Sequence, residues 1–315
     1  MNILILGGTG FVGRSICNKL VADGHTLSVP TRKRDNAREL FALPTVTVEE
    51  ADIHEFATLR RLAKGKHAVI NLVGILNEKK SGGFERAHVT LTHNIIDACK
   101  AAGVKRYLHM SALGAAADAP SIYQQTKARA EKLVTDSGLN ATIFAPSVIF
   151  GAGDSFLNKF AQLVGLLPPF LPFAPMILPG ASAKFQPVWV DDVARAFALS
   201  LNDASTYGKR FELTGPTVYS LKQLVAHVMQ LANNRHPIIG LPGIVTSALA
   251  SVMQFVPTQP LTPDNVKSMS VDNVSSAPWP AFLGNRATLE DIAPTYLGVA
   301  AVTDEFAPAR EKAKH

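Results

Sequence analysis

A glycine-rich turn close to the start of the chain constrains the fold more than any other feature. The apolar run Asn2–Leu6 has the length of a short buried strand, and Phe11–Ala22 carries apolar residues at helical spacing. The turn between them, Gly7–Gly13, follows the pattern G-x-x-G-x-x-G in a strand–turn–helix context. Small residues let a pyrophosphate approach the backbone, and N–H groups at the helix N-terminus attract its charge. Unless the turn is purely structural, we expect a dinucleotide here, in contact with Gly7, Thr9, Gly10, Phe11, Val12 and Gly13.

Strand-like and helix-like segments alternate through the first half of the chain. Such alternation is typical of a parallel sheet with helices on both faces and right-handed crossovers between its strands. The predicted fold class is therefore α/β, with a doubly wound (Rossmann) parallel sheet. The next expected strands are Thr26–Val29, Thr45–Val48, His67–Val73, Arg106–Met110 and Ala141–Phe144, and the next expected helices are Arg38–Leu43, Phe56–Ala63, Phe84–Ala102 and Tyr123–Ser137.

The composition changes after Gly151, where proline and phenylalanine become dense. We expect residues 1–150 to form the dinucleotide-binding Rossmann domain, and residues 151–300 to form mainly a smaller C-terminal substrate or partner lobe. Residues 188–201 are expected to return to the Rossmann domain, and residues 305–315 to form a solvated tail. The later expected elements are strands at Val188–Val190 and Phe211–Thr214 and helices at Asp191–Leu201, Leu221–Ala232 and Gly243–Val256.

The residues after the second expected strand indicate which dinucleotide binds. NAD-specific sites place an acidic residue about 20 positions beyond the glycines, where it holds the ribose 2′-OH. Here that position is Arg32, followed by Lys33 and Arg34. Because a guanidinium pairs with a phosphate through two hydrogen bonds, Arg32 predicts NADP(H) in preference to NAD(H). The alternative is a solvated basic loop.

Two further strand ends are candidates for cofactor contacts. Asp52 and Ile53 follow the third expected strand, where a doubly wound site meets the adenine. Asp52 also suits the N-cap of the next helix, so its role stays open. Asn71, Val73 and Gly74 end the fourth expected strand, where the backbone can run beside the cofactor.

A tyrosine and a lysine one helical turn apart predict the catalytic groups. Tyr123 and Lys127 form Y-x-x-x-K, which puts both on one helix face. An ammonium beside a phenol favours the phenolate, so we expect Lys127 to lower the pKa of Tyr123. Ser111 ends the fifth expected strand, at the sheet edge that faces ligands. Unless the pair is merely a surface one, Ser111 would polarise a substrate carbonyl, Tyr123 would exchange the proton, and Lys127 would also bind the nicotinamide ribose.

The chain resembles the short-chain dehydrogenase/reductase superfamily in its glycine turn, in the segment Asn71–Gly74, in Ser111 and in the Tyr123/Lys127 pair. More narrowly, it is similar to the atypical branch that contains the nucleotide-binding accessory subunit of respiratory complex I and its bacterial relatives. The likeness covers nearly the whole chain. Four stretches carry the narrower likeness, namely His109–Ala115, Pro146–Gly151, Gln186–Ala194 and Leu261–Val266.

The resemblance implies NADP(H) bound to the N-terminal domain, with Pro146 among its contacts. In the mitochondrial subunit of this branch the nucleotide is a structural element beside the quinone-reactive region, and a fungal member is associated with ubiquinone biosynthesis. Bacterial members are often labelled epimerases or dehydratases. Three functions are therefore open: an oxidoreductase for an apolar carbonyl or quinone-type substrate, a non-catalytic NADPH-binding subunit or assembly factor of a respiratory or ubiquinone-biosynthesis complex, and a nucleotide-sugar epimerase.

Apolar side chains in the second half of the chain allow several roles. They could line a substrate pocket, face a membrane or form the core of the second lobe, and we expect the core. The expected helix Gly243–Val256 offers the same choice, and we again expect it to be core. The aromatic and aliphatic residues in question are Phe156, Phe160, Leu163, Leu167, Phe170 and Phe173.

Other classes of function are disfavoured by the residues present. His54 lacks a second histidine at zinc-site spacing, so no metal is expected. The net charge of +6 comes without a basic stripe interleaved with aromatics, so no nucleic acid is expected. Lys159 and five prolines break the apolar stretch Phe156–Gly180, which argues against a membrane span. Cys17 and Cys99 lie in helix-like segments and the N-terminus lacks a basic signal region, which favours a cytoplasmic protein, with peripheral contact at the inner membrane left open.

Overall fold

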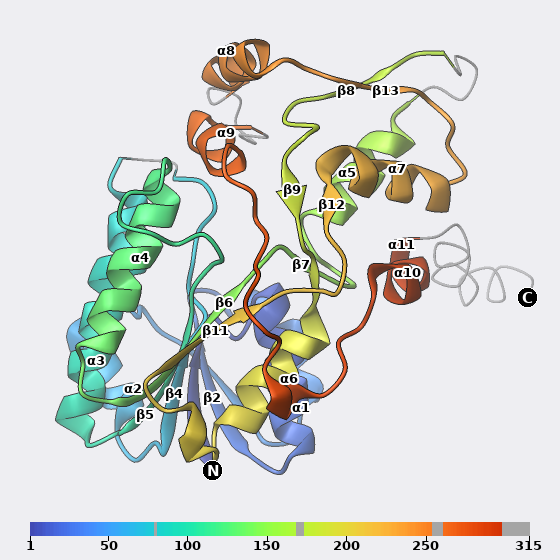
Figure 1. Ribbon diagram of the computed structural model, residues 1–315. Coiled ribbons are helices and arrows are strands. Elements are labelled where there is room, and N and C mark those ends of the chain that lie inside the picture. Colours follow the sequence, from blue (N-terminus) through green and yellow to red (C-terminus); the bar gives the residue numbers. More distant parts are fainter. Residues whose placement is uncertain (79–80, 168–172, 254–260, 298–315) are drawn as a thin grey trace, which may run out of the picture. The chain divides into compact units, whose positions relative to one another are not determined.

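Figure 1 shows the computed structural model of the chain, which describes residues 1–78, 81–167, 173–253 and 261–297. The chain divides into two compact units. The first unit comprises Met1–Pro146, Val190–Leu213 and Ser276–Gly284. The second unit comprises Ser147–Trp189, Thr214–Ser275 and the chain from Asn285 onward.

A seven-stranded sheet, parallel throughout, forms the centre of the first unit, with strand order β11-β6-β5-β4-β1-β2-β3. The strands in the middle of the sheet are buried along nearly their whole length because helices cover both faces. This arrangement confirms the predicted doubly wound α/β fold. The strands are β1 (Asn2–Leu6), β2 (Thr26–Thr31), β3 (Val46–Glu50), β4 (Ala68–Asn71), β5 (Arg106–Met110), β6 (Asn140–Pro146) and β11 (Lys209–Leu213).

Two helical layers cover this sheet (Figure 1). In one layer, α2 (Phe56–Ala63), α3 (Leu91–Ala102) and α4 (Ile122–Thr135) lie side by side. In the other, α1 (Phe11–Ala22) packs along α6 (Val190–Ser200). Alternate side chains of each strand point to opposite faces, so a single strand serves both layers.

Strand β6 illustrates how one strand contributes to both layers. Ile143 belongs to the buried cluster that contains Leu91 and Ile95 of α3. Its neighbour Phe144 packs against Phe197 of α6, with ring centroids 4.6 Å apart and the rings tilted by 47°. The apolar sequence of β6 therefore anchors helices on both faces.

Two predicted helices of the first unit have a different form. Where a helix was expected at Arg38–Leu43, the chain forms a 3₁₀ helix from Arg34 to Ala42. The expected single helix Phe84–Ala102 begins instead with a π-helical turn, η2 (Glu85–Thr90), before α3 continues it. Both differences are changes of hydrogen-bond register, which hydrophobic spacing does not report.

The second unit is built from short elements around a core of its own. That core includes Phe150, Leu157, Leu221 and Leu224. Three two-stranded ladders accompany it: β7 (Ile149–Phe150) with β10 (Val188–Trp189), β9 (Lys184–Phe185) with β12 (Tyr219–Ser220), and β8 (Met176–Leu178) with β13 (Ile238–Gly240). The helices are α5 (Leu157–Gly165), α7 (Leu221–Leu231), α8 (Gly243–Met253), α9 (Pro263–Met269), α10 (Leu289–Ile292) and α11 (Pro294–Leu297).

The expectation that α8 is core is wrong. Its side chains Ile244 and Val252 are 87% and 68% exposed. The helix is apolar on nearly every side, so packing one face leaves apolar residues on the others. Residues 254–256 of the expected helix lie outside the described residues, as does the expected tail 305–315.

The aromatic residues before β8 divide between core and surface. Phe156, Phe160 and Leu167 pack against the core of the second unit, as expected. Leu163 and Phe173 are 49% and 88% exposed, so the core expectation is wrong for them. Phe170 lies outside the described residues. Among the helices that are described, none has the length and hydrophobicity required to cross a membrane.

Candidate functional site

The glycine turn between β1 and α1 leaves no room for side chains at two of its positions. A Cβ atom on Gly13 would lie 2.4 Å from the carbonyl oxygen of Gly7, and one on Gly8 would lie 2.8 Å from a methyl of Val29 in β2. Gly7 has φ +83, the left-handed conformation that favours glycine, and its carbonyl accepts the N–H of Gly10 at 3.1 Å. The first turn of α1 is therefore held directly against the end of β1.

The N-terminus of α1 is open to an anion. The N-cap residue, Gly10, is exposed and has no side chain that could cap the helix. The first turn of α1 contains no acidic residue. Thr9, Phe11 and Val12 are half-buried around it. Main-chain N–H groups and the positive end of the helix dipole can therefore receive a pyrophosphate, so the predicted contacts fit a dinucleotide.

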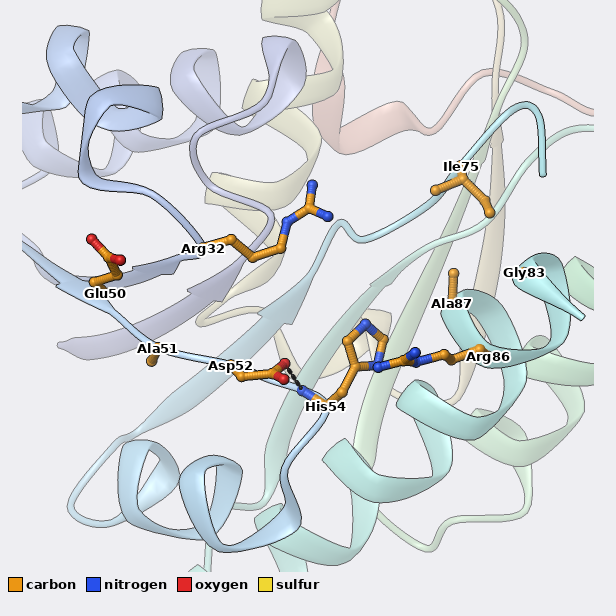
Figure 2. Close-up of a pocket in the computed structure, with 9 residues that line it drawn as sticks. All are labelled: Arg32, Glu50, Ala51, Asp52, His54, Ile75, Gly83, Arg86 and Ala87. Atoms are coloured by element: carbon orange, nitrogen blue, oxygen red, sulfur yellow. Dashed lines mark hydrogen bonds between the residues drawn. The ribbon is translucent and has the colours of Figure 1, made fainter. Parts of the chain in front are cut away.

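A pocket of about 570 Å³ lies beyond the ends of β2 and β3 in the first unit. Figure 2 shows that it contains two of the predicted residues, Arg32 directly after β2 and Asp52 after β3. The other lining residues were not among the predicted cofactor contacts. These are Glu50, Ala51, His54, Ile75, Gly83, Arg86 and Ala87.

Asp52 is not a helix cap. Glu55 is the N-cap residue of α2, and the Asp52 carboxylate instead accepts the main-chain N–H of His54 at 2.9 Å. This bond turns the chain after β3 and keeps Asp52 at the pocket. Ile53 between them is half-buried against the core of the first unit.

Asn71 shapes the segment that follows β4. Its side chain is buried, and its amide NH₂ donates to the Tyr107 hydroxyl at 3.1 Å while its carbonyl oxygen accepts the N–H of Val73 at 3.1 Å. A Cβ on Gly7 would lie 3.2 Å from the nitrogen of Val73, so this segment runs directly beside the glycine turn. Asn71 therefore positions the segment after β4, and the glycine turn lies against the main chain of this segment at Val73.

Lys127 lies close to that segment. A Cβ on Gly74 would be 3.2 Å from the Lys127 ammonium, and the ammonium donates to the main-chain carbonyl of Met110 at 3.1 Å. Lys127 is buried, and burial lowers its pKa to about 8 although Glu131 opposes the shift. The structure therefore brings together the end of β5, the segment after β4 and helix α4.

Tyr123 lies one turn earlier on α4. The N-cap residue of this helix is Ser121, whose hydroxyl accepts the N–H of Gln124 at 3.1 Å. The Tyr123 ring meets Phe84 and His88 edge-on, with centroid distances of 5.9 and 5.5 Å. The expected lowering of the pKa of Tyr123 is wrong for this structure, because burial raises it to about 12. Desolvation of the phenolate outweighs any attraction by the neighbouring ammonium.

His88 is a member of this cluster that sequence reasoning missed. Its Nε2 accepts the N–H of Ile75 at 3.2 Å, and its Nδ1 lies 2.9 Å from the Thr126 hydroxyl. Burial and the Lys127 charge lower the pKa of His88 to about 3, so the imidazole is neutral. No sequence signal marks it, because its partners are distant in the chain.

Ser111 follows β5 directly and is buried. Its main-chain N–H donates to the main-chain carbonyl of Phe144 at 2.7 Å. Its Oγ, in contrast, has no hydrogen-bond partner in the described part of the chain. A buried hydroxyl without a partner is costly, and such atoms mark places where a ligand can bind. His109 is buried and stacks on Tyr107.

Pro146 ends β6 and is buried. Its carbonyl accepts the N–H of Leu113 at 2.9 Å, which ties the loop after Ser111 to β6. The structure therefore brings Pro146 to the same sheet edge as Ser111. A contact between Pro146 and a cofactor stays a prediction.

Comparisons with known proteins agree with this geometry. A family model described as NAD(P)H-binding matches residues 7–154. The chain is 31% identical over 283 residues to the mitochondrial NADH dehydrogenase (ubiquinone) 1 alpha subcomplex subunit 9 of Mus musculus, covering 88% of this chain and 74% of that protein. It is also 31% identical over 166 residues to a ceramide reductase of Caulobacter vibrioides, covering 53% and 52% of the two chains.

The fold has a close counterpart among solved structures. An NADPH-dependent quinone oxidoreductase from Escherichia coli, complexed with NADPH, superposes with a TM-score of 0.73 at 21% identity, covering 94% of this chain and 99% of that one. At this identity the likeness concerns the fold alone. The sequence match to the mitochondrial subunit is what defines the family, and the chain belongs to the atypical short-chain dehydrogenase/reductases of the NADH dehydrogenase (ubiquinone) 1 alpha subcomplex subunit 9 family, with an NAD(P)H-binding Rossmann domain.

Proposed function

We propose that this protein is an NADP(H)-dependent oxidoreductase that reduces an apolar carbonyl or a quinone-type substrate, with Ser111, Tyr123 and Lys127 as its catalytic residues. The observation that carries the proposal is the buried Ser111 hydroxyl without a partner among the described residues. Ser111 follows Met110, whose main-chain carbonyl accepts a hydrogen bond from the Lys127 ammonium. A hydroxyl in this position can donate a hydrogen bond to a substrate oxygen.

The protonation states favour reduction. With its pKa raised to about 12, Tyr123 carries its proton at neutral pH and can give it to the oxygen of a carbonyl as that carbon is reduced. Lys127, with a pKa of about 8, is mostly charged at neutral pH and stabilises the phenolate that this transfer leaves. The bound cofactor supplies the hydride.

The remaining residues hold the cofactor. The N–H groups at the start of α1 receive the pyrophosphate, Arg32 pairs with the 2′-phosphate and so favours NADP(H) over NAD(H), and Lys127 also binds the nicotinamide ribose. Asp52 and Ile53 contact the adenosine end. The main chain at Asn71, Val73 and Gly74, together with Pro146, runs beside the cofactor.

An apolar substrate is supported by the names of similar proteins. The relative from Caulobacter vibrioides is a ceramide reductase, and the structural neighbour from Escherichia coli is a quinone oxidoreductase. Purified protein is therefore tested with NADPH and a panel of quinones and long-chain ketones, following nicotinamide absorbance. We expect substrate-dependent NADPH oxidation that Tyr123→Phe lowers by about 100-fold or more while leaving NADPH affinity unchanged. Turnover that survives this change would exclude Tyr123 as the proton donor.

A second candidate is a non-catalytic NADPH-binding subunit or assembly factor of a respiratory or ubiquinone-biosynthesis complex. It is favoured by the extent of the match to a complex I subunit, which covers 88% of this chain. A structural nucleotide would stay bound through extensive washing of the purified protein and would resist oxidation by every quinone and carbonyl in the panel. A cofactor that exchanges rapidly and is oxidised would favour the enzyme.

We also propose a cytoplasmic location with peripheral contact at the inner membrane, made by the second unit. The support is its exposed apolar side chains, which include Leu166 at 80%, Phe173 at 88% and Ile244 at 87% exposure. Flotation with liposomes measures this contact. Ile244→Ser combined with Val252→Ser is expected to reduce flotation without changing NADPH affinity, and unchanged flotation would contradict the membrane role.

A further inference from the structure

Three basic side chains from three different elements line the pocket of the first unit (Figure 2). Arg32 follows β2, His54 lies between β3 and α2, and Arg86 belongs to the π-helical turn η2. Arg32 and Arg86 are exposed, and within the described residues neither guanidinium forms a hydrogen bond or an ion pair. Both are therefore available as donors to an anion.

Two carboxylates line the same pocket, and both already accept main-chain hydrogen bonds. Glu50 accepts the N–H of Arg34 at 3.3 Å, and Asp52 accepts that of His54 at 2.9 Å. With the His54 imidazole neutral, the formal charges of Arg32 and Arg86 balance those of the two carboxylates. A doubly charged phosphate would therefore leave the pocket with a net charge of −2, and one further positive charge would reduce this to −1.

His54 is placed to supply that charge. The side chain is half-buried, and its pKa is lowered by burial and by the charges of Arg86 and Arg32, which the Asp52 carboxylate opposes. Both guanidiniums line the same pocket as the imidazole. The neutral imidazole is therefore favoured while the pocket contains no anion, and a phosphate among the three groups would reverse that preference.

We propose that Arg86 and His54 complete the 2′-phosphate site with Arg32, and that His54 takes up a proton when the phosphate binds. The ligand class is a purine nucleotide with a phosphate on its ribose. Ala51, Ile75 and Ala87 provide apolar wall for the flat base, and a volume of about 570 Å³ suits that part of a cofactor. The inference rests on the proposed binding of NADP(H) and adds two residues that determine its selectivity.

The first test compares Arg86→Gln with Arg60→Gln. Arg60 is an exposed arginine of α2 that does not line the pocket, so its variant controls for the loss of one positive charge. We expect Arg86→Gln to weaken NADPH about tenfold and to leave NADH affinity unchanged, because one charge-assisted contact to the phosphate is lost. Arg60→Gln should change neither. Equal losses for both cofactors, or no loss for NADPH, would overturn the role of Arg86.

The second test measures protons. Calorimetric titration of wild-type protein near neutral pH, in two buffers of different ionisation enthalpy, is expected to show proton uptake with NADPH and none with NADH. Neighbouring cations lower the phosphate's own second pKa, which is about 6, so the phosphate releases protons and acts in the opposite direction. His54→Gln retains the main-chain bond to Asp52 and should abolish the uptake. Uptake that persists in His54→Gln would overturn the role of His54.

The outcomes separate this inference from the proposed function. If wild-type protein shows no preference for NADPH over NADH, the proposed cofactor selectivity fails and this inference fails with it. A second outcome is that wild-type protein prefers NADPH, that Arg32→Gln removes this preference, and that the Arg86 and His54 variants keep it. In that case the proposed selectivity stands and only this inference fails. Titration with ADP and with ADP carrying a 2′-phosphate identifies the phosphate as the group that the three side chains bind.

Discussion

The Lys127 ammonium donates a hydrogen bond to the main-chain carbonyl of Met110 at 3.1 Å, and so joins helix α4 to the strand end from which Ser111 projects. A buried ammonium that already donates to a carbonyl has less capacity to stabilise the charge of a neighbouring phenolate. Burial of the phenol raises the pKa of Tyr123 to about 12, so Tyr123 retains its proton at neutral pH. The same contact places the three proposed catalytic residues at one edge of the sheet.

Turnover should depend on pH through Lys127. Its pKa is lowered to about 8, whereas that of Tyr123 is raised to about 12. As pH rises through about 8, the ammonium loses its proton and can no longer stabilise the phenolate, so the rate should fall along a single limb while Tyr123 stays protonated. The profile of kcat against pH measures this. A rate that instead rises through the same range would mean that the phenolate, not the phenol, is the active form.

Gly13→Ala should destabilise the first unit and abolish nucleotide binding. The new methyl would lie 2.4 Å from the carbonyl oxygen of Gly7, and neither partner is a flexible side chain. Overpacking of this kind typically costs about 1–3 kcal/mol, which denaturant unfolding measures. Gly165→Ala is the matched control, since no atom within 4 Å would meet its Cβ. A Gly13→Ala protein with normal stability and normal NADPH affinity would show that the turn is not the phosphate site.

Arg32→Asp should reverse the cofactor preference. The substitution replaces a donor for the 2′-phosphate by an acceptor for the ribose 2′-OH, at the position where NAD-specific sites carry an acid. NADPH affinity is expected to fall by at least about tenfold, while NADH affinity is kept or improved. Fluorescence titration with each cofactor measures both. The same loss for the two cofactors would remove the basis for the predicted preference.

His88→Leu should loosen the segment after β4. It leaves the N–H of Ile75 without its acceptor, and removes the ring that stacks against Phe84 at 5.6 Å. A buried group that loses its partner costs about 1–3 kcal/mol of stability, and NADPH affinity should fall with it. His88→Gln keeps an acceptor and should recover part of the lost stability and part of the lost NADPH affinity. Because its pKa is about 3, His88 should add no pH dependence near neutrality. Equal stability of both variants with wild type would contradict this positioning role.

Sequence reasoning was most successful where structure depends on local spacing. The bounds of β1, α1, α2 and β5 were predicted to the residue, because each is a short strand or an amphipathic helix bounded by turn residues. The glycine turn was predicted for the same reason. Arg32 and Asp52 were predicted to be near the cofactor, and both line one pocket.

Long-range contacts account for most of what was missed. His88 meets Thr126 across 38 residues, and Arg86 reaches the pocket from a π-helical turn whose register no hydrophobic pattern reveals. The pKa of Tyr123 was predicted in the wrong direction because desolvation depends on the packing around the ring, which spacing does not describe. The strands β8 and β13 pair in parallel across about 60 residues of chain, an arrangement that no hairpin signal marks.

A crystal structure of the protein soaked with NADPH tests the central claim most directly. The account predicts the pyrophosphate on the N–H groups from Gly10 to Gly13, the 2′-phosphate beside Arg32, and the nicotinamide next to Ser111 and Tyr123. Density for the dinucleotide away from the glycine turn, or a nicotinamide out of reach of the Tyr123 hydroxyl, would contradict it.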